Sequence, residues 1–388
     1  MTVLTAGDYD GLATNYIFTF GDPPIGHQVL ETTPTTYAIS NNTWSMSKFY
    51  GSDLTYDAAG RLTGGLVTGW EAWGPMYVYS ELETPANAKF FSLQGFSVPA
   101  VTLATWIADR SQLGFNSGPV LFAGDDSITG SPLDDYLVGH AGSDTISGGA
   151  GKDVLDGGHG DTLEDGSNHL RGDDGDDEIY GGAGSDDISG GAGDDRIHGT
   201  WYIDGPGPGA NLLRGDGGND EIWGAVGFDD INGNQGNDTA HGGAGDDWVV
   251  GGKDDDLLFG DAGNDLVYGN LGNDTDDGGA GNDTVRGGQG DDVLYGGAGD
   301  DYISGDRGDD TETGGAGADH FHGFGDAGTD KVLDFSYAEG DRVVLDLGTR
   351  YATAQVGADT VINMAGGGQM ILVGVQLSTL GSDWIFFG

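Results

Sequence analysis

Aspartate recurs at every ninth residue through the middle of this chain, in turns that consist largely of glycine. Two successive units read Gly181-Gly-Ala-Gly-Ser-Asp-Asp-Ile-Ser189 and Gly190-Gly-Ala-Gly-Asp-Asp-Arg-Ile-His198, with aspartate sixth and an apolar residue eighth. A turn of this kind offers carboxylate and backbone carbonyl oxygens with no bulky side chain in the way. Calcium prefers six to eight such oxygens, at about 2.3–2.6 Å. The spacing therefore predicts a row of calcium sites.

The sixth-position aspartates are the predicted metal ligands. They are Asp135, Asp144, Asp153, Asp177, Asp186, Asp195, Asp220, Asp229, Asp238, Asp247, Asp256, Asp265, Asp274, Asp283, Asp292, Asp301, Asp310 and Asp319. One repeat is broken near Asp161, and Asn168 takes the aspartate place where the repeat resumes. Residues 200–209 form an inserted loop, after which Asn211 takes the aspartate place. Asp254 replaces a turn glycine. We assign no calcium count at Asp161 and Asp254.

The repeat also predicts the elements that carry these turns. Glycine permits tight turning, and the last three residues of each unit form a short strand whose middle side chain points inward. Two units then make one coil, and successive coils stack at about 4.8 Å into two parallel sheets. One apolar side chain per nine residues is too little to offset the entropy of ordering the backbone. Bound calcium would supply the missing stabilisation.

The nonapeptide G-G-x-G-x-D-x-U-x, where U is apolar, resembles the RTX family, also called the hemolysin-type calcium-binding repeat. The resemblance covers residues 123–330, about half of the chain. It implies an all-β fold with a calcium-bound parallel β-roll, in which the aspartates above are carboxylate ligands. A flexible acidic linker is the alternative, and the strict spacing argues against it.

A longer period of 36 residues lies inside the short one. One series of inward residues lacks a large apolar side chain at every second coil: Ile222, Ala240, Leu258, Asp276, Leu294 and Glu312. The other series is apolar throughout: Leu213, Ile231, Val249, Val267, Val285, Ile303 and Phe321. Asp276 and Glu312 have three interpretations: buried acids with raised pKa, extra metal ligands, or places where the strand opens and the carboxylate reaches water. We favour local opening.

The same period places Trp223, Phe259 and Tyr295 outward, as an aromatic ladder with rungs about 9.6 Å apart. We hypothesise that this face contacts another copy, another domain or a polysaccharide. The alternative is duplication of a 36-residue unit in which surface aromatics are tolerated.

The segments on either side of the repeat lack its period. Residues 1–122 predict a mostly β domain that serves assembly or ligand binding, with strands at Tyr16 and Met76, a strand–turn–strand over residues 51–69 and a helix over residues 98–109. Residues 331–388 predict a cap with strands beginning near Val332, Arg342, Thr360 and Met370, since the end of a solenoid needs covering.

Composition excludes several classes of function. Acidic residues number 64 against 14 basic, for a formal charge of −50, so nucleic acid is not an expected partner. Cysteine is absent, and no apolar stretch approaches the roughly 18 residues of a membrane span. Motifs for nucleophile elbows, zinc-binding helices and phosphate loops are missing, so no enzyme activity is expected. His198, His241 and His322 fall at the ninth position and are expected to be solvated surface groups.

The N-terminal residues show no signal for the general secretory route, whereas Gly381-Ser-Asp-Trp-Ile-Phe-Phe-Gly388 resembles the uncleaved signal of type I secretion substrates. We therefore expect an extracellular or cell-surface protein that meets the type I machinery during export. Its expected role is structural, as a self-assembling filament, surface-layer or matrix component. A calcium-dependent adhesin or carbohydrate-binding protein is the first alternative. A secreted enzyme or toxin with an unrecognised N-terminal site is the second.

Overall fold

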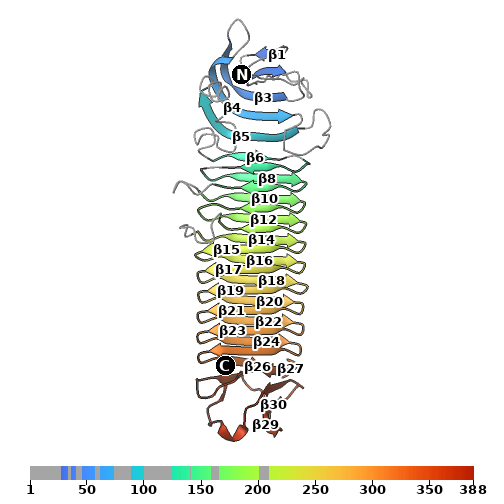
Figure 1. Ribbon diagram of the computed structural model, residues 1–388, viewed down its shortest axis with the longest axis vertical. Coiled ribbons are helices and arrows are strands. Elements are labelled where there is room, and N and C mark those ends of the chain that lie inside the picture. Colours follow the sequence, from blue (N-terminus) through green and yellow to red (C-terminus); the bar gives the residue numbers. More distant parts are fainter. Residues whose placement is uncertain are drawn as a thin grey trace. The chain divides into compact units, whose positions relative to one another are not determined.

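The structure is a computed structural model of the chain (Figure 1). It describes the backbone of five strands between residues 28 and 99, and both backbone and side chains in 125–130, 132–139, 141–158, 166–200 and 209–388. The chain forms two compact units, Met1–Asp174 and Gly175–Gly388, and the division falls inside the repeat. Among the described residues the one helical element is the 3-10 turn η2 (Leu377–Thr379), so the predicted all-β class is confirmed.

The first unit begins with an antiparallel meander. Its strands are β1 (Gln28–Thr33), β2 (Thr36–Ser40), β3 (Met46–Tyr56), β4 (Leu62–Trp73) and β5 (Lys89–Pro99), and each pairs with the next. The predicted strand–turn–strand over residues 51–69 corresponds to β3 and β4 and is confirmed. The helix expected from Val98 is wrong at its start, because Val98 pairs with Val67 at the end of β5. Residues 100–109 and the strands expected at Tyr16 and Met76 lie outside the described residues.

The repeat strands of the first unit are parallel. Strand β6 (Ser127–Thr129) pairs antiparallel with β5 and parallel with β8 (Thr145–Ala150), which in turn pairs with β10 (His169–Asp174). Strands β7 (Tyr136–Val138) and β9 (Val154–Asp156) form a second parallel pair. The change from antiparallel to parallel pairing therefore takes place at β6.

The second unit contains two stacks of strands, which we call sheet A and sheet B. Sheet A consists of β12 (Asp187–Ala192), β14 (Leu212–Gly217), β16 (Asp230–Gln235), β18 (Trp248–Lys253), β20 (Leu266–Leu271), β22 (Thr284–Gln289), β24 (Tyr302–Arg307), β26 (His320–Gly323), β28 (Arg342–Leu345) and β32 (Ile385–Phe387). Sheet B consists of β11 (Glu178–Tyr180), β13 (Arg196–His198), β15 (Glu221–Val226), β17 (Thr239–Ala244), β19 (Leu257–Ala262), β21 (Thr275–Ala280), β23 (Val293–Ala298), β25 (Thr311–Ala316), β27 (Thr329–Val332), β31 (Gln369–Leu372), β30 (Asp359–Met364) and β29 (Tyr351–Val356). Pairing is parallel except at β31–β30 and β30–β29.

The chain alternates between the two sheets, and from β14 to β26 each strand residue pairs with the one 18 positions further on. Ile231 pairs with Val249 in sheet A, and Leu258 pairs with Asp276 in sheet B. Two nine-residue units thus make one coil of a parallel β-solenoid, as predicted. The inserted loop lengthens one step without disturbing the register, since Ile188 pairs with Leu213.

The core of the second unit is a single layer of inward side chains between the sheets. Every inward residue from Ile222 to Phe321 is fully buried, including Ala240, Asp276 and Glu312 at 0% exposure. The expected opening of the strand at Asp276 and Glu312 is therefore wrong. Parallel pairing continues on both sides of Asp276, to Leu258 and to Leu294, so the carboxylate stays inside the core instead of reaching water.

Glycine is required where one turn stacks on the next. A Cβ on Gly263 would overlap the carbonyl oxygen of Gly245, one coil earlier, and the φ of Gly263 is +153°. Asp254 occupies the equivalent place in its own turn with φ 74°, a left-handed conformation that aspartate tolerates better than most residues. The turns therefore stack backbone on backbone.

The strands predicted near Arg342, Thr360 and Met370 are confirmed as β28, β30 and β31. The strand predicted to begin at Val332 is wrong in its bounds, because β27 ends at Val332, and Asp334 instead accepts the backbone N–H groups of Gly314 and Gly315. The inward residues of these four strands, with Phe335 and Trp384, extend the apolar layer beyond Phe321 into a larger cluster. The last coil is thereby covered by apolar side chains of its own unit.

Candidate metal centres

All eighteen predicted aspartate ligands lie at the turns and are buried, at 0% to 7% exposure. In the second unit they form two columns. Column A precedes the strands of sheet A and contains Asp186, Asp229, Asp247, Asp265, Asp283, Asp301 and Asp319, with Asn211 in one place. Column B precedes the strands of sheet B and contains Asp177, Asp195, Asp220, Asp238, Asp256, Asp274, Asp292 and Asp310. Asp135, Asp144 and Asp153 hold the same places in the first unit.

Most of these aspartates use one carboxylate oxygen to accept a hydrogen bond from the coil before them. The backbone N–H of Asp283 donates to Oδ1 of Asp301 at 2.8 Å, and the backbone N–H of Asp220 donates to Oδ1 of Asp238 at 2.8 Å. The same bond recurs down both columns at 2.8–3.1 Å, and in the first unit the N–H of Asp135 donates to Oδ1 of Asp153 at 2.7 Å. Oδ1 is therefore committed to the backbone.

The second oxygen, Oδ2, is left for something else. In the described part of the chain it is buried and accepts no hydrogen bond in Asp195, Asp220, Asp238, Asp247, Asp256, Asp265, Asp274, Asp283, Asp292, Asp301 and Asp310. A buried, unsatisfied carboxylate oxygen is costly, and its regular recurrence points to a bound cation.

The space in front of Oδ2 is kept open by the first glycine of each unit. A Cβ on Gly296 would lie 2.6 Å from Oδ2 of Asp301 and 2.6 Å from the carbonyl oxygen of Gly314, one coil further on. A Cβ on Gly278 would likewise lie 2.8 Å from Oδ2 of Asp283 and 2.6 Å from the carbonyl oxygen of Gly296. One carboxylate and one carbonyl oxygen thus converge where only glycine fits. This donor set is the one that calcium takes.

The carboxylates alone do not enclose an ion. Within the described residues no group of three or more acidic or histidine side chains is arranged to hold a metal. Calcium in these turns would therefore depend on backbone carbonyls together with Oδ2, which fits a hard cation and disfavours zinc, because zinc prefers nitrogen and sulfur ligands.

Burial strongly disfavours the charged form of these acids in the absence of a cation. Desolvation raises the pKa of Asp195 and Asp256 to about 8, that of Asp247 and Asp301 to about 7, and that of Asp274 to about 6. Neighbouring aspartates raise these pKa values further, while the backbone N–H bonds to Oδ1 lower them. A divalent cation would reverse the balance by stabilising the carboxylate form.

Comparison with known families agrees with this geometry. The model of the RTX calcium-binding nonapeptide repeat matches residues 129–163, 164–197, 206–240, 241–276 and 277–312. This chain is an RTX-repeat protein. RTX repeats indicate a secreted, calcium-binding protein. No helix among the described residues is long and apolar enough to cross a membrane.

Among solved structures, the RTX protein is similar to the extracellular lipase LipA from Serratia marcescens, with 20% sequence identity and a TM-score of 0.26. The match covers 64% of this chain and 40% of the lipase chain, so the lipase activity is not transferred. A comparison with curated proteins found no match.

Three places in the RTX columns depart from the pattern. Asp229 uses Oδ2 to accept the N–H of Ala225 at 2.7 Å, so this oxygen is not left open. Oδ1 of Asn211 accepts the backbone N–H of Asp186 at 2.9 Å, so the row of hydrogen bonds continues through this coil. In place of the second oxygen, Asn211 presents an amide nitrogen. Asp254 leaves the neighbouring ligand in place, because Oδ2 of Asp256 still faces Gly251.

The structure adds three aspartates that the predicted ligand set lacks. Asp126 donates its backbone N–H to Asp144 at 2.8 Å, the backbone N–H of Asp319 donates to Asp341 at 3.1 Å, and Asp330 accepts the backbone N–H of Asp310. Asp126 stands nine residues before Asp135, so the period itself carries this signal. Asp330 and Asp341 are harder to find because the turns before them are longer, although each precedes a basic residue and a valine in the strand.

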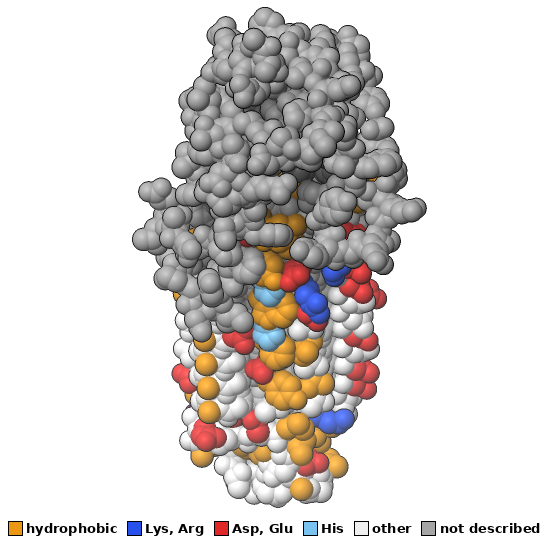
Figure 2. Space-filling view, turned by 45° about the horizontal axis from the view of Figure 1, so that its top comes forward, with side chains coloured by type: hydrophobic (Ala, Val, Ile, Leu, Met, Phe, Trp, Pro, Cys, Tyr) orange, Lys and Arg blue, Asp and Glu red, His pale blue; other side chains and the backbone are white. Residues whose placement is uncertain are grey.

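Two of the three predicted contact residues, Trp223 and Phe259, lie on the outer face of sheet B in a continuous row of rings. Tyr180 stacks on His198 at 4.8 Å between ring centroids, His198 on Trp223 at 4.5 Å, Trp223 on His241 at 6.3 Å, and His241 on Phe259 at 4.4 Å. We call these five residues the ring ladder. Figure 2 shows hydrophobic side chains with histidines among them along one face of the repeat.

The ring ladder differs from the predicted one in two respects. His198 and His241 are half-buried between rings instead of fully solvated, and burial lowers the pKa of His198. Tyr295 is separated from Phe259 by Asp277, so it does not continue the stack. The rings present their edges outward, because their faces are covered by one another.

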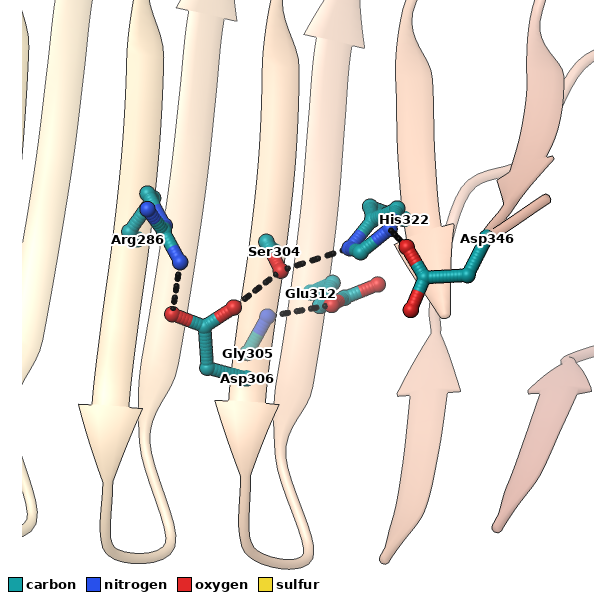
Figure 3. A network of polar contacts seen from close by, with 7 residues as sticks. All are labelled: Arg286, Ser304, Gly305, Asp306, Glu312, His322 and Asp346. Atoms are coloured by element: carbon teal, nitrogen blue, oxygen red, sulfur yellow. Dashed lines mark hydrogen bonds and ion pairs between the residues drawn. The ribbon is translucent and has the colours of Figure 1, made fainter. Parts of the chain in front are cut away.

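A polar network on the outer face of sheet A contains the residue types of a hydrolase triad (Figure 3). Oγ of Ser304 lies 3.2 Å from Nδ1 of His322, whose Nε2 lies 3.3 Å from Oδ1 of Asp346. Ser304 is 1% exposed, and its hydroxyl donates to Oδ1 of Asp306 at 2.7 Å. Asp306 also accepts from Arg286 at 2.6 Å. The serine proton is thus committed to a carboxylate, so the network ties neighbouring strands together and does not activate a nucleophile.

Proposed function

We propose that this RTX protein is an extracellular structural protein whose β-roll folds when calcium fills the turns, and which then self-assembles at a surface or in a matrix. The two columns of buried Oδ2 atoms, each facing a first glycine, carry the proposal. Without a cation these oxygens oppose folding, whereas with calcium they become ligands.

Calcium dependence would also suit export by the type I route. Residues 381–388 belong to the folded cap: Trp384 is 8% exposed and packs against Phe335, and β32 pairs with β28. A signal in this position is accessible only before the cap folds. Low calcium inside the cell would keep the array open for threading, and higher calcium outside would fold it.

Self-assembly is supported by the free edges of the cap. Among the described strands, β32 pairs only with β28 and β29 only with β30. Apolar side chains are exposed near these edges, including Leu347 at 81%, Val356 at 57% and Phe387 at 44%. Unpaired strand edges with exposed apolar side chains are templates for pairing with another chain.

The ring ladder gives less support to a polysaccharide-binding role. Sugars stack on the faces of aromatic rings, and in the ladder those faces lie 4.4–6.3 Å from the next ring. A ligand-binding or enzymatic site within residues 1–122 is the alternative function.

Negative-stain microscopy with light scattering tests the proposal on the full chain. The protein is refolded in millimolar calcium and, in parallel, in chelator. Ordered filaments or sheets that dissolve on chelation are expected. A calcium-folded monomer at all concentrations would exclude self-assembly and favour the adhesin, which a glycan-binding screen would then address. An array with the same circular dichroism spectrum in calcium and chelator would exclude the calcium-dependent fold.

A further inference from the structure

Two coils of sheet B place an acid where the others place an apolar residue. Asp276 and Glu312 point inward on either side of Leu294, in one row with Leu258, and both are 0% exposed. They stand 36 residues apart, which is two coils, and Ala240 holds the equivalent place two coils before Asp276. Neither belongs to the sixth-position columns.

Glu312 reaches across the core to a calcium-type turn. Its Oε1 accepts the backbone N–H of Gly305 at 2.9 Å (Figure 3). Gly305 is the first glycine of its unit, and a Cβ there would overlap Oδ2 of Asp310. Oε2 of Glu312 is buried without a hydrogen-bond partner among the described residues. Glu312 therefore meets, from the core side, the same glycine that Asp310 meets from the turn.

Asp276 repeats this relationship one 36-residue period earlier. It stands seven residues after Gly269, as Glu312 stands seven after Gly305, and a Cβ on Gly269 would overlap Oδ2 of Asp274. Both carboxylate oxygens of Asp276 are buried and lack a hydrogen bond of normal geometry in the described structure. The N–H of Gly269 is near enough to favour its charged form.

The charged groups that act on these two carboxylates are themselves acids. They are Asp274, Asp292 and Asp256 for Asp276, and Asp330, Asp310 and Asp306 for Glu312. A buried charge with only like charges around it is strongly destabilising. Two arrangements remove the cost: a proton on each inward acid, or a cation shared with the adjacent column B aspartates.

We propose that Asp276 and Glu312 are additional carboxylate ligands, which act from the core on calcium held at the turns that begin with Gly269 and Gly305. This inference rests on the calcium function proposed above. Calcium affinity rises with the number of charged ligands. The two turns would therefore be the tightest sites of column B and would fill first.

Leucine substitutions separate the two arrangements, because neighbouring coils already carry leucine in this row. Asp276→Leu, Glu312→Leu and the double variant are made in the full chain. Isothermal titration calorimetry measures the classes of calcium site, and circular dichroism measures the calcium concentration at half-folding. If the acids are ligands, the tightest class is lost, its affinity falls about 10–100-fold, and half-folding needs more calcium. If they are protonated core acids, leucine removes a buried polar group, and half-folding needs the same or less calcium, which overturns the inference.

Asp276→Asn and Glu312→Gln guard against a packing artefact, since they keep the size and one oxygen and remove the charge. They must weaken the same tight class without any change in the wild-type spectrum at saturating calcium. Retention of the tight class in these variants also overturns the inference. A wild-type chain that takes up no calcium defeats the proposed function itself, whereas calcium uptake with identical site classes in every variant defeats this inference alone.

Discussion

Asp301 holds Asp283 through one oxygen and leaves the other free for a metal. The backbone N–H of Asp283 donates to Oδ1 of Asp301 at 2.8 Å, while Oδ2 of Asp301 is buried in front of Gly296. Structural and metal-binding roles are thereby divided between two atoms of one side chain. Conservative substitutions can separate the two roles.

Asp301→Asn should impair calcium binding more than it impairs the coil. The amide keeps Oδ1 as an acceptor for Asp283 and replaces Oδ2 by nitrogen, as Asn211 does in its own coil. We expect loss of one carboxylate ligand and weaker calcium binding by about 10-fold or more, measured by calorimetry. Asp301→Ala should also destabilise the coil, because it removes the hydrogen bond from the N–H of Asp283. This loss should lower the free energy of unfolding by a further amount of about 1–3 kcal/mol.

The reciprocal change, Asn211→Asp, supplies the missing oxygen. It should increase calcium affinity or add to the calcium bound per chain, with the hydrogen bond to Asp186 retained. Unchanged binding in both Asp301→Asn and Asn211→Asp would contradict the role assigned to Oδ2.

Gly296→Ala should block a site by filling the space between the two oxygens, without requiring an unusual φ. The new methyl group would lie 2.6 Å from Oδ2 of Asp301 and 2.6 Å from the carbonyl oxygen of Gly314, and Gly296 does not have a positive φ. We expect loss of calcium from this turn and a higher calcium concentration at half-folding, followed by circular dichroism.

Gly217→Ala is the matched control. A Cβ there would meet nothing nearer than the carbonyl oxygen of Gly191 at 3.8 Å, so the variant should bind calcium as the wild type does. Equal behaviour of the two alanine variants would show that the space beside Gly296 holds no ion.

The pH dependence should have opposite signs with and without calcium. Burial raises the pKa of Asp301 to about 7 and that of Asp256 to about 8, from an ordinary value of 3.8. A carboxyl group whose pKa is higher in the folded than in the unfolded chain stabilises the fold while it is protonated. This contribution is complete below about pH 4 and is lost as the pH rises through about 7 to 8. In chelator, acidification to pH 4.5 should therefore increase β-structure relative to pH 8.

With calcium present, protons compete for the same oxygens. The calcium concentration at half-folding should rise as the pH falls from 8 to 6, and calcium binding at pH 7 should release protons, detectable by calorimetry in buffers of different ionisation enthalpy. A calcium midpoint independent of pH across this window would mean that the buried aspartates are not the ligands.

Asp254→Gly should stabilise the calcium-loaded fold. Asp254 adopts φ 74° at a place where the other nonapeptide turns of the second unit have glycine, and relief of that strain is worth about 1 kcal/mol after the entropic cost of glycine. Urea unfolding in saturating calcium measures the change.

Asp255→Gly provides the comparison with opposite sign. Oδ1 of Asp255 accepts the N–H of Asn273 at 2.8 Å, and removal of this bond should destabilise the fold by about 1 kcal/mol. Destabilisation by both glycine variants would show that the left-handed conformation of Asp254 carries no strain.

The repeat period alone predicts the coil, the two sheets and the aspartate columns. These features are periodic, because every nine-residue unit repeats the same positions for the turn, for the inward side chain and for the carboxylate. The same period contains Asp126, although the predicted ligand set began nine residues later.

The roles of individual atoms depend on how successive coils pack against one another. The division between Oδ1 and Oδ2 depends on the 18-residue register, which places Asp283 of one coil beside Asp301 of the next. Asp330 and Asp341 do not follow the nine-residue period, because the turns before them are longer. The stacking of His198 on Trp223 depends on the separation of neighbouring strands. Glu312 reads in sequence as an interruption of an apolar series. The thin core brings it within 2.9 Å of Gly305 in the opposite sheet, because a single layer of side chains is all that separates the two sheets.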